Sequence, residues 1–269
     1  MFTHADGSSW LALVIGNTRL HWAFFKEQLL QRVWHTPHLT LQEMHFWQQG
    51  IEPKHWPEDL VKLASAQAQS NTAMPWWVAS VVQPQLQLWE SYPFVQVVQR
   101  HHIPLGNLYP TLGVDRALAL LGAGTTYSWP SLVIDGGTAL TFTAGVEGQF
   151  WGGAILPGLS LQFQALANQT DALPHIEMPS SLPARWATNT EEAIQSGILY
   201  TQIAGICDYI NHWQKAFPTG QVLLTGGDGE RLRHFIGELA SDLAGQIRLD
   251  ANLMFWGLRA YREAMLTGC

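Results

Sequence analysis

The chain has 269 residues and a formal net charge of −7 at pH 7; 47% of its residues are hydrophobic and 13% are charged. This length allows one large domain or two of ordinary size, and the apolar content is sufficient for a full core. The negative net charge argues against a general nucleic-acid-binding protein, because such a protein needs a basic surface to neutralise phosphates.

The cysteines and the N-terminal residues indicate a cytoplasmic protein. Cys207 and Cys269 form neither a disulfide framework nor a metal-binding spacing, which fits a reducing compartment. Residues 1–9 lack a basic region, and the apolar stretch 10–15 is too short for a signal peptide or a membrane span. We therefore expect a cytosolic protein without a membrane segment.

The first half of the chain begins with a predicted hairpin. Apolar runs at 11–15 and 20–25 flank Gly16-Asn17-Thr18, a pattern typical of strand, turn and strand. The later elements predicted in this half are helices at 40–50 and 53–75, strands at 76–82 and 94–98, a loop at 105–111 and a helix at 114–122.

The second half restarts with a similar pattern. An apolar strand at 131–134 leads into Asp135-Gly136-Gly137-Thr138. Thr188-Asn189-Thr190-Glu191 has the form of a capping box, so we expect it to begin a long helix with a stripe of mostly small residues. The stripe comprises Ala193, Gly197, Tyr200, Ala204 and Cys207. The other elements predicted here are strands at 140–144, 150–155 and 222–224 and helices at 159–167, 229–240 and 253–264.

The two halves share an internal repeat. Residues 13–18 and residues 133–138 are each an apolar strand that runs into a turn of glycine and threonine and then into another strand. This repeat predicts an α/β protein with two duplicated lobes, residues 1–112 and 113–269, and a cleft between them. With only two copies, chance similarity is the alternative.

The two repeated turns are candidate phosphate-binding loops. In Gly16-Asn17-Thr18, glycine would let the backbone approach a phosphate, although a plain hairpin turn has the same composition. In the second turn, Asp135 could hold a cation against phosphate oxygens, because Mg²⁺ is usually bound by one or two carboxylates and by substrate phosphates. An aspartate that bonds its own backbone is the alternative.

Three further motifs could carry chemistry. In Gly113-Val114-Asp115-Arg116, a carboxylate could accept a hydroxyl proton and a guanidinium could bind an anion; an N-capping aspartate with an exposed arginine is the alternative. Thr225-Gly226-Gly227-Asp228 could place bare backbone against an adenine, or be a simple strand-to-helix turn. Gly152-Gly153, with Pro157-Gly158, could form a wall of an active site, or only a close backbone contact.

Motifs of other enzyme classes are missing from the sequence. It contains no HExxH, GxSxG, P-loop or GxGxxG pattern, and its eleven histidines show no clear ligand spacing. Metalloprotease and nucleophilic-hydrolase functions therefore have little support.

In this order, the motifs resemble those of the type III pantothenate kinase family over residues 11–258. The matching motifs are residues 16–19, 109–110, 112–116, 134–138, 152–153, 157–158, 189–190, 193, 197 and 225–227. The resemblance implies the fold of acetate and sugar kinases, Hsp70 and actin. It also implies ATP-dependent phosphorylation of pantothenate to 4′-phosphopantothenate, the first step of coenzyme A biosynthesis.

The resemblance also implies roles for individual residues. Asp115 matches the proposed general base, and Asp135 matches a residue that helps to hold a monovalent cation, K⁺ or NH₄⁺. ATP with Mg²⁺ is the implied donor. Family members are homodimers in which the partner subunit closes the pantothenate pocket. The implied pantothenate contacts are Tyr109, Gly113, Arg116 and Thr190, and the implied contacts of ATP are Gly16, Asn17, Thr18, Gly137, Thr138, Gly226 and Gly227.

Two positions depart from the family pattern. Val14 stands where the family usually has aspartate, and His21 stands where it usually has lysine. The lost carboxylate would remove an anchor for Mg²⁺ near the phosphates. Two alternatives therefore remain: a catalytically weakened binding or regulatory protein of the same fold, similar to the Bvg accessory factor, and a kinase for another small hydroxylated substrate.

Overall fold

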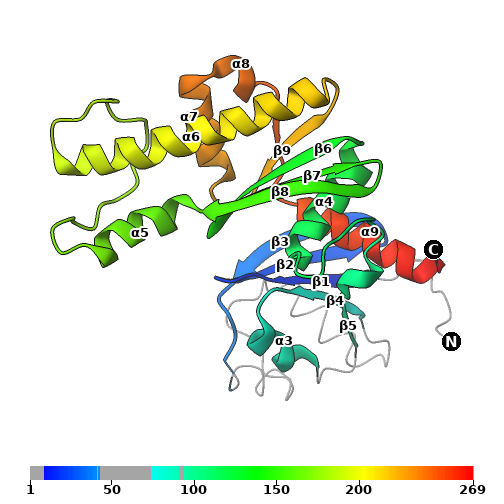
Figure 1. Ribbon diagram of the computed structural model, residues 1–269. Helices are drawn as coiled ribbons and strands as arrows, with labels where there is room; N and C mark the ends of the chain where they lie inside the picture. The colour runs from blue at the N-terminus through cyan, green and yellow to red at the C-terminus, as the bar shows by residue number, and fades with distance from the viewer. Residues whose placement is uncertain (1–8, 41, 43–73, 91–93, 269) are drawn as a thin grey trace. The chain divides into compact units, whose positions relative to one another are not determined.

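The computed structural model describes residues 9–40, 42, 74–90 and 94–268 (Figure 1). The chain divides into two compact units. Unit 1 comprises Met1–Pro104, Pro110–Leu118 and Leu258–Cys269, and unit 2 comprises Leu105–Tyr109 and Ala119–Gly257. The lobe boundary was predicted between residues 112 and 113. The main difference is that Leu258–Cys269 belongs to unit 1 and not to the second unit. The division into functional lobes 1–112 and 113–269 stays a prediction.

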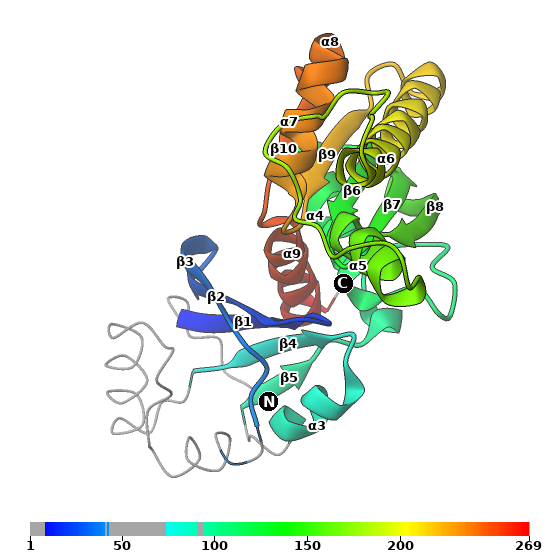
Figure 2. The ribbon, with the colours of Figure 1, turned by 90° about the vertical axis from the view of Figure 1, so that its left-hand side faces the viewer.

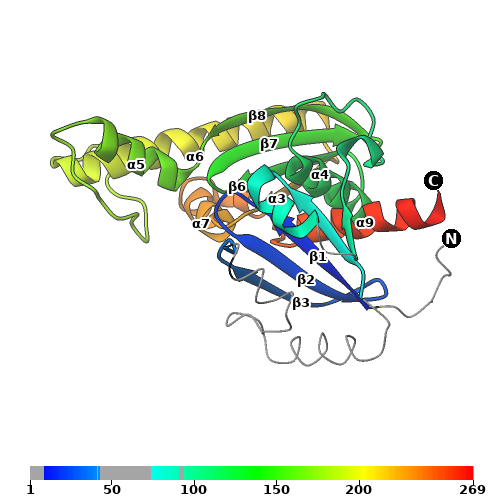
Figure 3. The same cartoon turned by 90° about the horizontal axis from the view of Figure 1, so that it is seen from below.

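The described part of unit 1 contains a five-stranded sheet in the order β3-β2-β1-β4-β5. The predicted hairpin is present, since β1 pairs antiparallel with β2, and β2 pairs in the same way with β3 (Figure 3). On the other side, β1 pairs parallel with β4, and β4 with β5. The strands are β1 (Ser9–Ile15), β2 (Leu20–Lys26), β3 (Leu29–Thr36), β4 (Trp76–Ser80) and β5 (Val95–Val97).

Tryptophan side chains fill the core of unit 1. The Trp22 ring stacks on Trp34, and it meets the rings of Trp76 and Trp89 edge-on at centroid distances of 5.9 and 5.4 Å. The indole Nε1 of Trp22 donates a hydrogen bond to Thr36 Oγ1, so burial leaves this polar atom satisfied. The short helix α3 (Gln83–Glu90) lies beside β4 and β5 (Figure 2).

Unit 2 repeats the sheet of unit 1. Its five strands have the order β10-β9-β6-β7-β8, in which β6-β7-β8 are antiparallel and β6-β9-β10 are parallel. The central strand β6 thus corresponds to β1, as the repeat in the sequence predicted. The strands are β6 (Ser131–Gly136), β7 (Ala139–Val146), β8 (Gln149–Pro157), β9 (Gln221–Thr225) and β10 (Ile247–Leu249).

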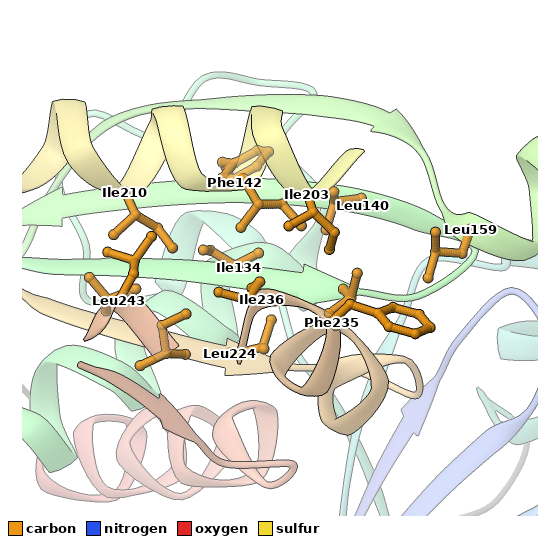
Figure 4. Close-up of a cluster of buried hydrophobic side chains, with 14 of the residues drawn as sticks. Ile134, Leu140, Phe142, Leu159, Ile203, Ile210, Leu224, Phe235, Ile236 and Leu243 are labelled. Carbon is orange, nitrogen blue, oxygen red and sulfur yellow. The ribbon is translucent and has the colours of Figure 1, made fainter. Parts of the chain in front are cut away.

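Helices cover the sheet of unit 2 and bury its apolar side chains. Ile203 and Ile210 of the long helix α6 pack against Ile134 of β6 and Phe142 of β7 (Figure 4). The helices of this unit are α5 (Leu159–Gln169), α6 (Thr190–Ala216), α7 (Gly229–Leu239) and α8 (Ser241–Ala244); α4 (Val114–Tyr127) and α9 (Leu253–Thr267) each run from one unit into the other.

A half-buried hydrogen-bond network joins α4 to the start of α9 within unit 2. The Asp250 carboxylate accepts hydrogen bonds from the Tyr127 hydroxyl at 2.7 Å and from the Trp256 indole at 2.8 Å. Burial and the Asp250 charge raise the pKa of Tyr127 to about 12, so its hydroxyl stays a donor at neutral pH. No helix within the described ranges is long and apolar enough to cross a membrane.

Some elements were not predicted from the sequence, and some predictions need correction or fall outside the described residues. No prediction covered β3, α3, α8, β10 or the short 3-10 helix Arg100–His102. A capping box was also predicted at Thr188, whereas the N-cap of α6 is Asn189, whose side chain accepts from the Glu192 amide. The helices predicted at 40–50 and 53–75 lie almost entirely outside the described residues.

Candidate active site

The first candidate phosphate loop is the turn between β1 and β2 in unit 1. The Gly16 amide donates to the Arg19 carbonyl at 3.1 Å, which closes the turn, while Asn17 and Thr18 are exposed. The Gly16 carbonyl accepts a hydrogen bond from His38 Nε2 at 2.7 Å, although His38 lies 22 residues further along the chain. Both polar backbone groups of Gly16 are therefore used within unit 1.

Val14 and His21 face each other across the β1–β2 pair. Val14 is buried, and His21 is its direct partner in register. His21 Nδ1 lies 3.1 Å from His35 Nδ1 on the neighbouring strand. Burial, His35 and Arg19 together lower the pKa of His21 to about 4, and burial and Arg19 also lower the pKa of His35. At neutral pH this position therefore carries a neutral imidazole, not the cation that lysine would supply.

Gly113, Asp115 and Arg116 lie together at the start of α4. An Asp115 carboxylate oxygen accepts a hydrogen bond from the Arg116 amide at 2.7 Å, and it occupies the space that a Cβ at Gly113 would need. Burial raises the pKa of Asp115, against the opposing effects of the Arg116 amide and charge. Asp115 lies inside the first turn of α4 and is therefore not its N-cap, and Arg116 is buried. The alternative of a capping aspartate with an exposed arginine is therefore wrong.

The second candidate loop and the nucleotide turn meet in unit 2. Asp135 stands at the end of β6, paired with Thr225 of β9. Gly226 has φ +87°, and a Cβ there would collide with the Asp135 carboxylate and the Gly136 carbonyl. The Asp228 amide donates to that same Gly136 carbonyl at 2.8 Å. Two turns separated by some 90 residues of sequence are thus joined by backbone contacts.

The predicted wall after β8 joins the same group. The Gly158 amide donates to the Thr138 carbonyl at 2.9 Å, and a Cβ at Gly158 would collide with the Gly137 carbonyl. The backbone of Gly158 therefore lies directly against the second loop. Gly227 differs, since its Cβ position has open space around it.

The remaining pantothenate-binding candidates, Tyr109 and Thr190, belong to unit 2. The exposed Tyr109 ring meets Phe150 of β8 edge-on at 5.5 Å. Thr190 is the exposed first residue of α6, directly after the N-cap Asn189. Gly113 and Arg116 belong to unit 1, so the four candidate contacts are divided between the two units.

His38 and Asp228 lie next to the loops, and the sequence predicted no role for either. His38 was missed because its hydrogen bond to Gly16 depends on the path of the chain after β3, which has no local signature. Asp228 is the last residue of the motif 225–228; its carboxylate pairs with Arg231 at 2.7 Å, and burial raises its pKa against the effect of that arginine. Its position after a glycine turn, at the start of a helix, was the available signal.

The groups near Asp135 suit hard cations that prefer oxygen ligands. They include the Asp135 carboxylate, Asp228 on the adjoining turn and the backbone carbonyls of these turns. Within the described ranges there is no cluster of three or more histidine, cysteine, aspartate or glutamate side chains able to hold a metal ion.

Comparison with known proteins gives consistent matches along the chain. The family model described as type III pantothenate kinase matches residues 10–212. A type III pantothenate kinase from Nostoc sp. is 45% identical over 258 residues, with 94% of each chain covered. A relative with the same description from Thermosynechococcus vestitus is 42% identical over 261 residues, covering 96% of this chain and 92% of its own.

Solved structures agree on the fold. A Baf family transcriptional activator from Campylobacter jejuni has a TM-score of 0.61 at 17% identity, covering 96% of this chain and 99% of its own. MreB5 of Spiroplasma citri bound to ADP has a TM-score of 0.50 at 10% identity, covering 98% and 99%. These similarities, together with the repeated sheet order, show an actin-like fold.

Proposed function

The chain belongs to the type III pantothenate kinase family, and we propose that it transfers the γ-phosphoryl group of ATP to the 4′-hydroxyl of pantothenate. The product is 4′-phosphopantothenate, and the reaction is the first step of coenzyme A biosynthesis. The observation that carries the proposal is the Asp115 carboxylate at the start of α4, beside Arg116, in a chain related to these kinases over almost its whole length.

Asp115 acts as the general base in this proposal. Burial raises the pKa of Asp115, and a higher pKa makes a carboxylate a better proton acceptor for a hydroxyl group. Arg116 and Gly113 bind and orient pantothenate from the same turn, and Tyr109 and Thr190 supply the other contacts. Phosphoryl transfer depends mainly on such positioning and on the neutralisation of charge.

Three glycine-containing turns bind ATP in this proposal. Gly16, Asn17 and Thr18 bind phosphate in unit 1, and Gly137 and Thr138 bind phosphate in unit 2. Gly226 and Gly227 lie beside the nucleotide, and the open space at Gly227 supports this role. Asp135 would help to hold a monovalent cation, K⁺ or NH₄⁺, which neutralises phosphate charge when bound. Mg²⁺ would be bound chiefly through ATP.

We also propose a homodimer and a cytoplasmic location. Ala193, Gly197 and Ala204 of the predicted stripe on α6 are exposed, whereas the buried face of this helix carries Ile198 and Ile203. Tyr200 and Cys207 of the same stripe are half-buried, and the Tyr200 ring is covered by Arg185. The three exposed positions are available to a second subunit. The cysteine usage and the charge of the chain favour a cytoplasmic protein with pantothenate and ATP as its partners, and neither nucleic acid nor a membrane is expected.

One observation favours a second candidate, a binding or regulatory protein with weakened catalysis. Val14 is buried in β1, so the first loop lacks the carboxylate that family members usually have there. The retained Asp115, Arg116 and Asp135 favour the kinase. Turnover decides between the two, since only the kinase converts pantothenate.

The test is ATP-dependent phosphorylation of pantothenate by the purified protein with Mg²⁺, with and without K⁺. We expect turnover that K⁺ stimulates, and a loss of roughly 10²–10⁴-fold in kcat for Asp115→Asn, the usual contribution of a general base. The matched control is Asp171→Asn, which alters an exposed carboxylate in unit 2 and should leave turnover unchanged. Wild-type protein that is folded but inactive would contradict the proposal and favour the second candidate.

The pH dependence gives an independent check on the base. Asp115 must be ionised to accept a proton, so kcat/KM should fall as the pH drops through its raised pKa, above the value of about 3.9 for an ordinary aspartate. A profile with no such acidic limb would argue against this role.

A further inference from the structure

The first phosphate loop is held by imidazole groups from elements outside it. His38 Nε2 donates to the Gly16 carbonyl at 2.7 Å. His21 Nε2 lies 3.3 Å from the position that a Cβ at Gly16 would take, so the His21 ring fills the space beside this glycine. Both contacts lie within unit 1 and reach the loop from the chain that follows it.

The His21 ring is itself fixed across the sheet. His21 and His35 are direct partners in the β2–β3 register, and their Nδ1 atoms are 3.1 Å apart, so one ring donates and the other accepts. Arg19 is the other charged group acting on both rings. With its Nδ1 edge bound to His35, the His21 ring presents its Nε2 edge to Gly16.

The hydrogen bond from His38 controls the direction of the next amide. A trans peptide is planar, so the Gly16 carbonyl and the Asn17 N–H point in opposite directions. A Gly16 carbonyl directed at His38 therefore turns the Asn17 amide away from His38. The Gly16 amide is bound to the Arg19 carbonyl, which limits rotation on the other side of the residue. A carbonyl that rotated toward a bound phosphate would instead repel it.

We propose that His38 is a positioning residue for ATP: its hydrogen bond holds the Gly16–Asn17 peptide in the orientation that binds phosphate. In this loop Val14 stands in place of the usual carboxylate. This inference rests on the proposed function of the loop. Without a carboxylate at position 14 to bind a metal ion beside the phosphates, phosphate binding depends more strongly on the orientation of the backbone amides. His38 supplies that orientation without touching the nucleotide.

Two substitutions at His38 separate the hydrogen bond from the bulk of the ring. His38→Phe keeps a ring but removes the donor, whereas His38→Gln supplies a side-chain N–H at a similar reach. We expect His38→Phe to raise the KM and the calorimetric Kd for ATP by about fivefold to tenfold, the effect of one hydrogen bond. The KM for pantothenate should stay within about twofold, and His38→Gln should stay close to wild type. His101→Phe, at an exposed histidine of unit 1, is the matched control.

The outcomes distinguish this inference from the proposed function. Unchanged ATP binding in His38→Phe, equal damage in His38→Gln, or a parallel rise of both KM values would overturn the role of His38, and the kinase would stand. Wild-type protein that binds ATP without turnover would contradict the kinase, while the calorimetric comparison would still decide the role of His38. Wild-type protein that binds no ATP would overturn both.

Discussion

At the scale of single residues, the surroundings of His21 in the folded protein disfavour the protonated, positively charged form of its imidazole. Its half-buried ring pairs with His35 and lies near Arg19, and burial, His35 and Arg19 lower its pKa from 6.5 to about 4. An unfolded chain would protonate the same ring near pH 6.5. The unfolded state therefore binds more protons than the folded state between these two pH values.

The stability of the protein should consequently depend on pH through His21. The free energy of unfolding should fall as the pH is lowered from about 6.5 to about 4, and the stabilisation should be complete above that window. The fall should be about 1–3 kcal/mol, given 1.4 kcal/mol per pKa unit and a reduction for the partial exposure of the ring. Urea unfolding between pH 4 and 8 measures it. His21→Gln should flatten the curve, and His101→Gln should leave it unchanged; equal slopes in wild type and His21→Gln would refute the role of His21.

The sequence indicated which candidate residues lie together where the motif and its contacts are local, and their roles in the site stay predictions. Gly113, Asp115 and Arg116 interact within one turn of helix, so four consecutive residues contain the whole arrangement. His38 could not be foreseen in this way. Its contact with Gly16 exists only because β2 and β3 return the chain to the start of the sheet, and nothing in the residues around His38 encodes that return.

At the scale of elements, the start of α6 depends on Asn189. Its side chain accepts a hydrogen bond from the Glu192 amide at 2.9 Å, one of the amides that a helix leaves unpaired at its N-terminus. Thr188 precedes it and is not the cap. A capping box and an asparagine cap one residue later look alike in sequence, since both residue types are favoured at this position.

Substitution separates the two caps. Asn189→Ala should lower the free energy of unfolding by about 1 kcal/mol, the usual cost of losing an N-cap, and Thr188→Ala should change it by much less. Urea unfolding of both variants against wild type is the measurement. A larger loss in Thr188→Ala than in Asn189→Ala would restore the capping box.

Strands were predictable where the sequence contains an apolar run. β1 and β6 form such runs because both of their faces are buried. The edge strand β8 is exposed or half-buried throughout but contains Ala154-Ile155-Leu156, whereas polar residues interrupt β3, so β3 escaped prediction. β10 has three residues with the charged Arg248 at its centre.

At the scale of the whole molecule, duplication was visible in the sequence only at the two central strands. β1 and β6 keep a common pattern because each ends in a glycine turn, and in our proposal each turn binds phosphate. The flanking strands share their order and direction but not their sequence pattern. A sheet requires apolar side chains at its buried positions, but many different apolar residues can fill them. The sheet order therefore needed the structure.

The proposed homodimer makes a prediction about the exposed face of α6. Ala193, Gly197 and Ala204 recur there at helical spacing, and Trp151 and Ile155 are exposed on β8, the edge strand of the same unit. Gly106 pairs with the first residues of β8, and the exposed apolar side chains further along this edge strand are features that a second subunit would cover. Wild-type protein should therefore have twice the mass of one chain by light scattering after gel filtration.

Ala204→Arg tests whether this face forms the contact and whether the contact serves the site. The variant should be monomeric and folded, because Ala204 is exposed and arginine is a good helix former. If the partner subunit closes the pantothenate pocket, its KM for pantothenate should rise at least tenfold while its KM for ATP changes little. Ala216→Arg is the matched control, since residue 216 lies about 120° around the same helix from Ala204. If Ala204→Arg remains dimeric, this face of α6 is not the dimer contact. If the variant is monomeric with an unchanged KM for pantothenate, each chain closes its own pantothenate pocket.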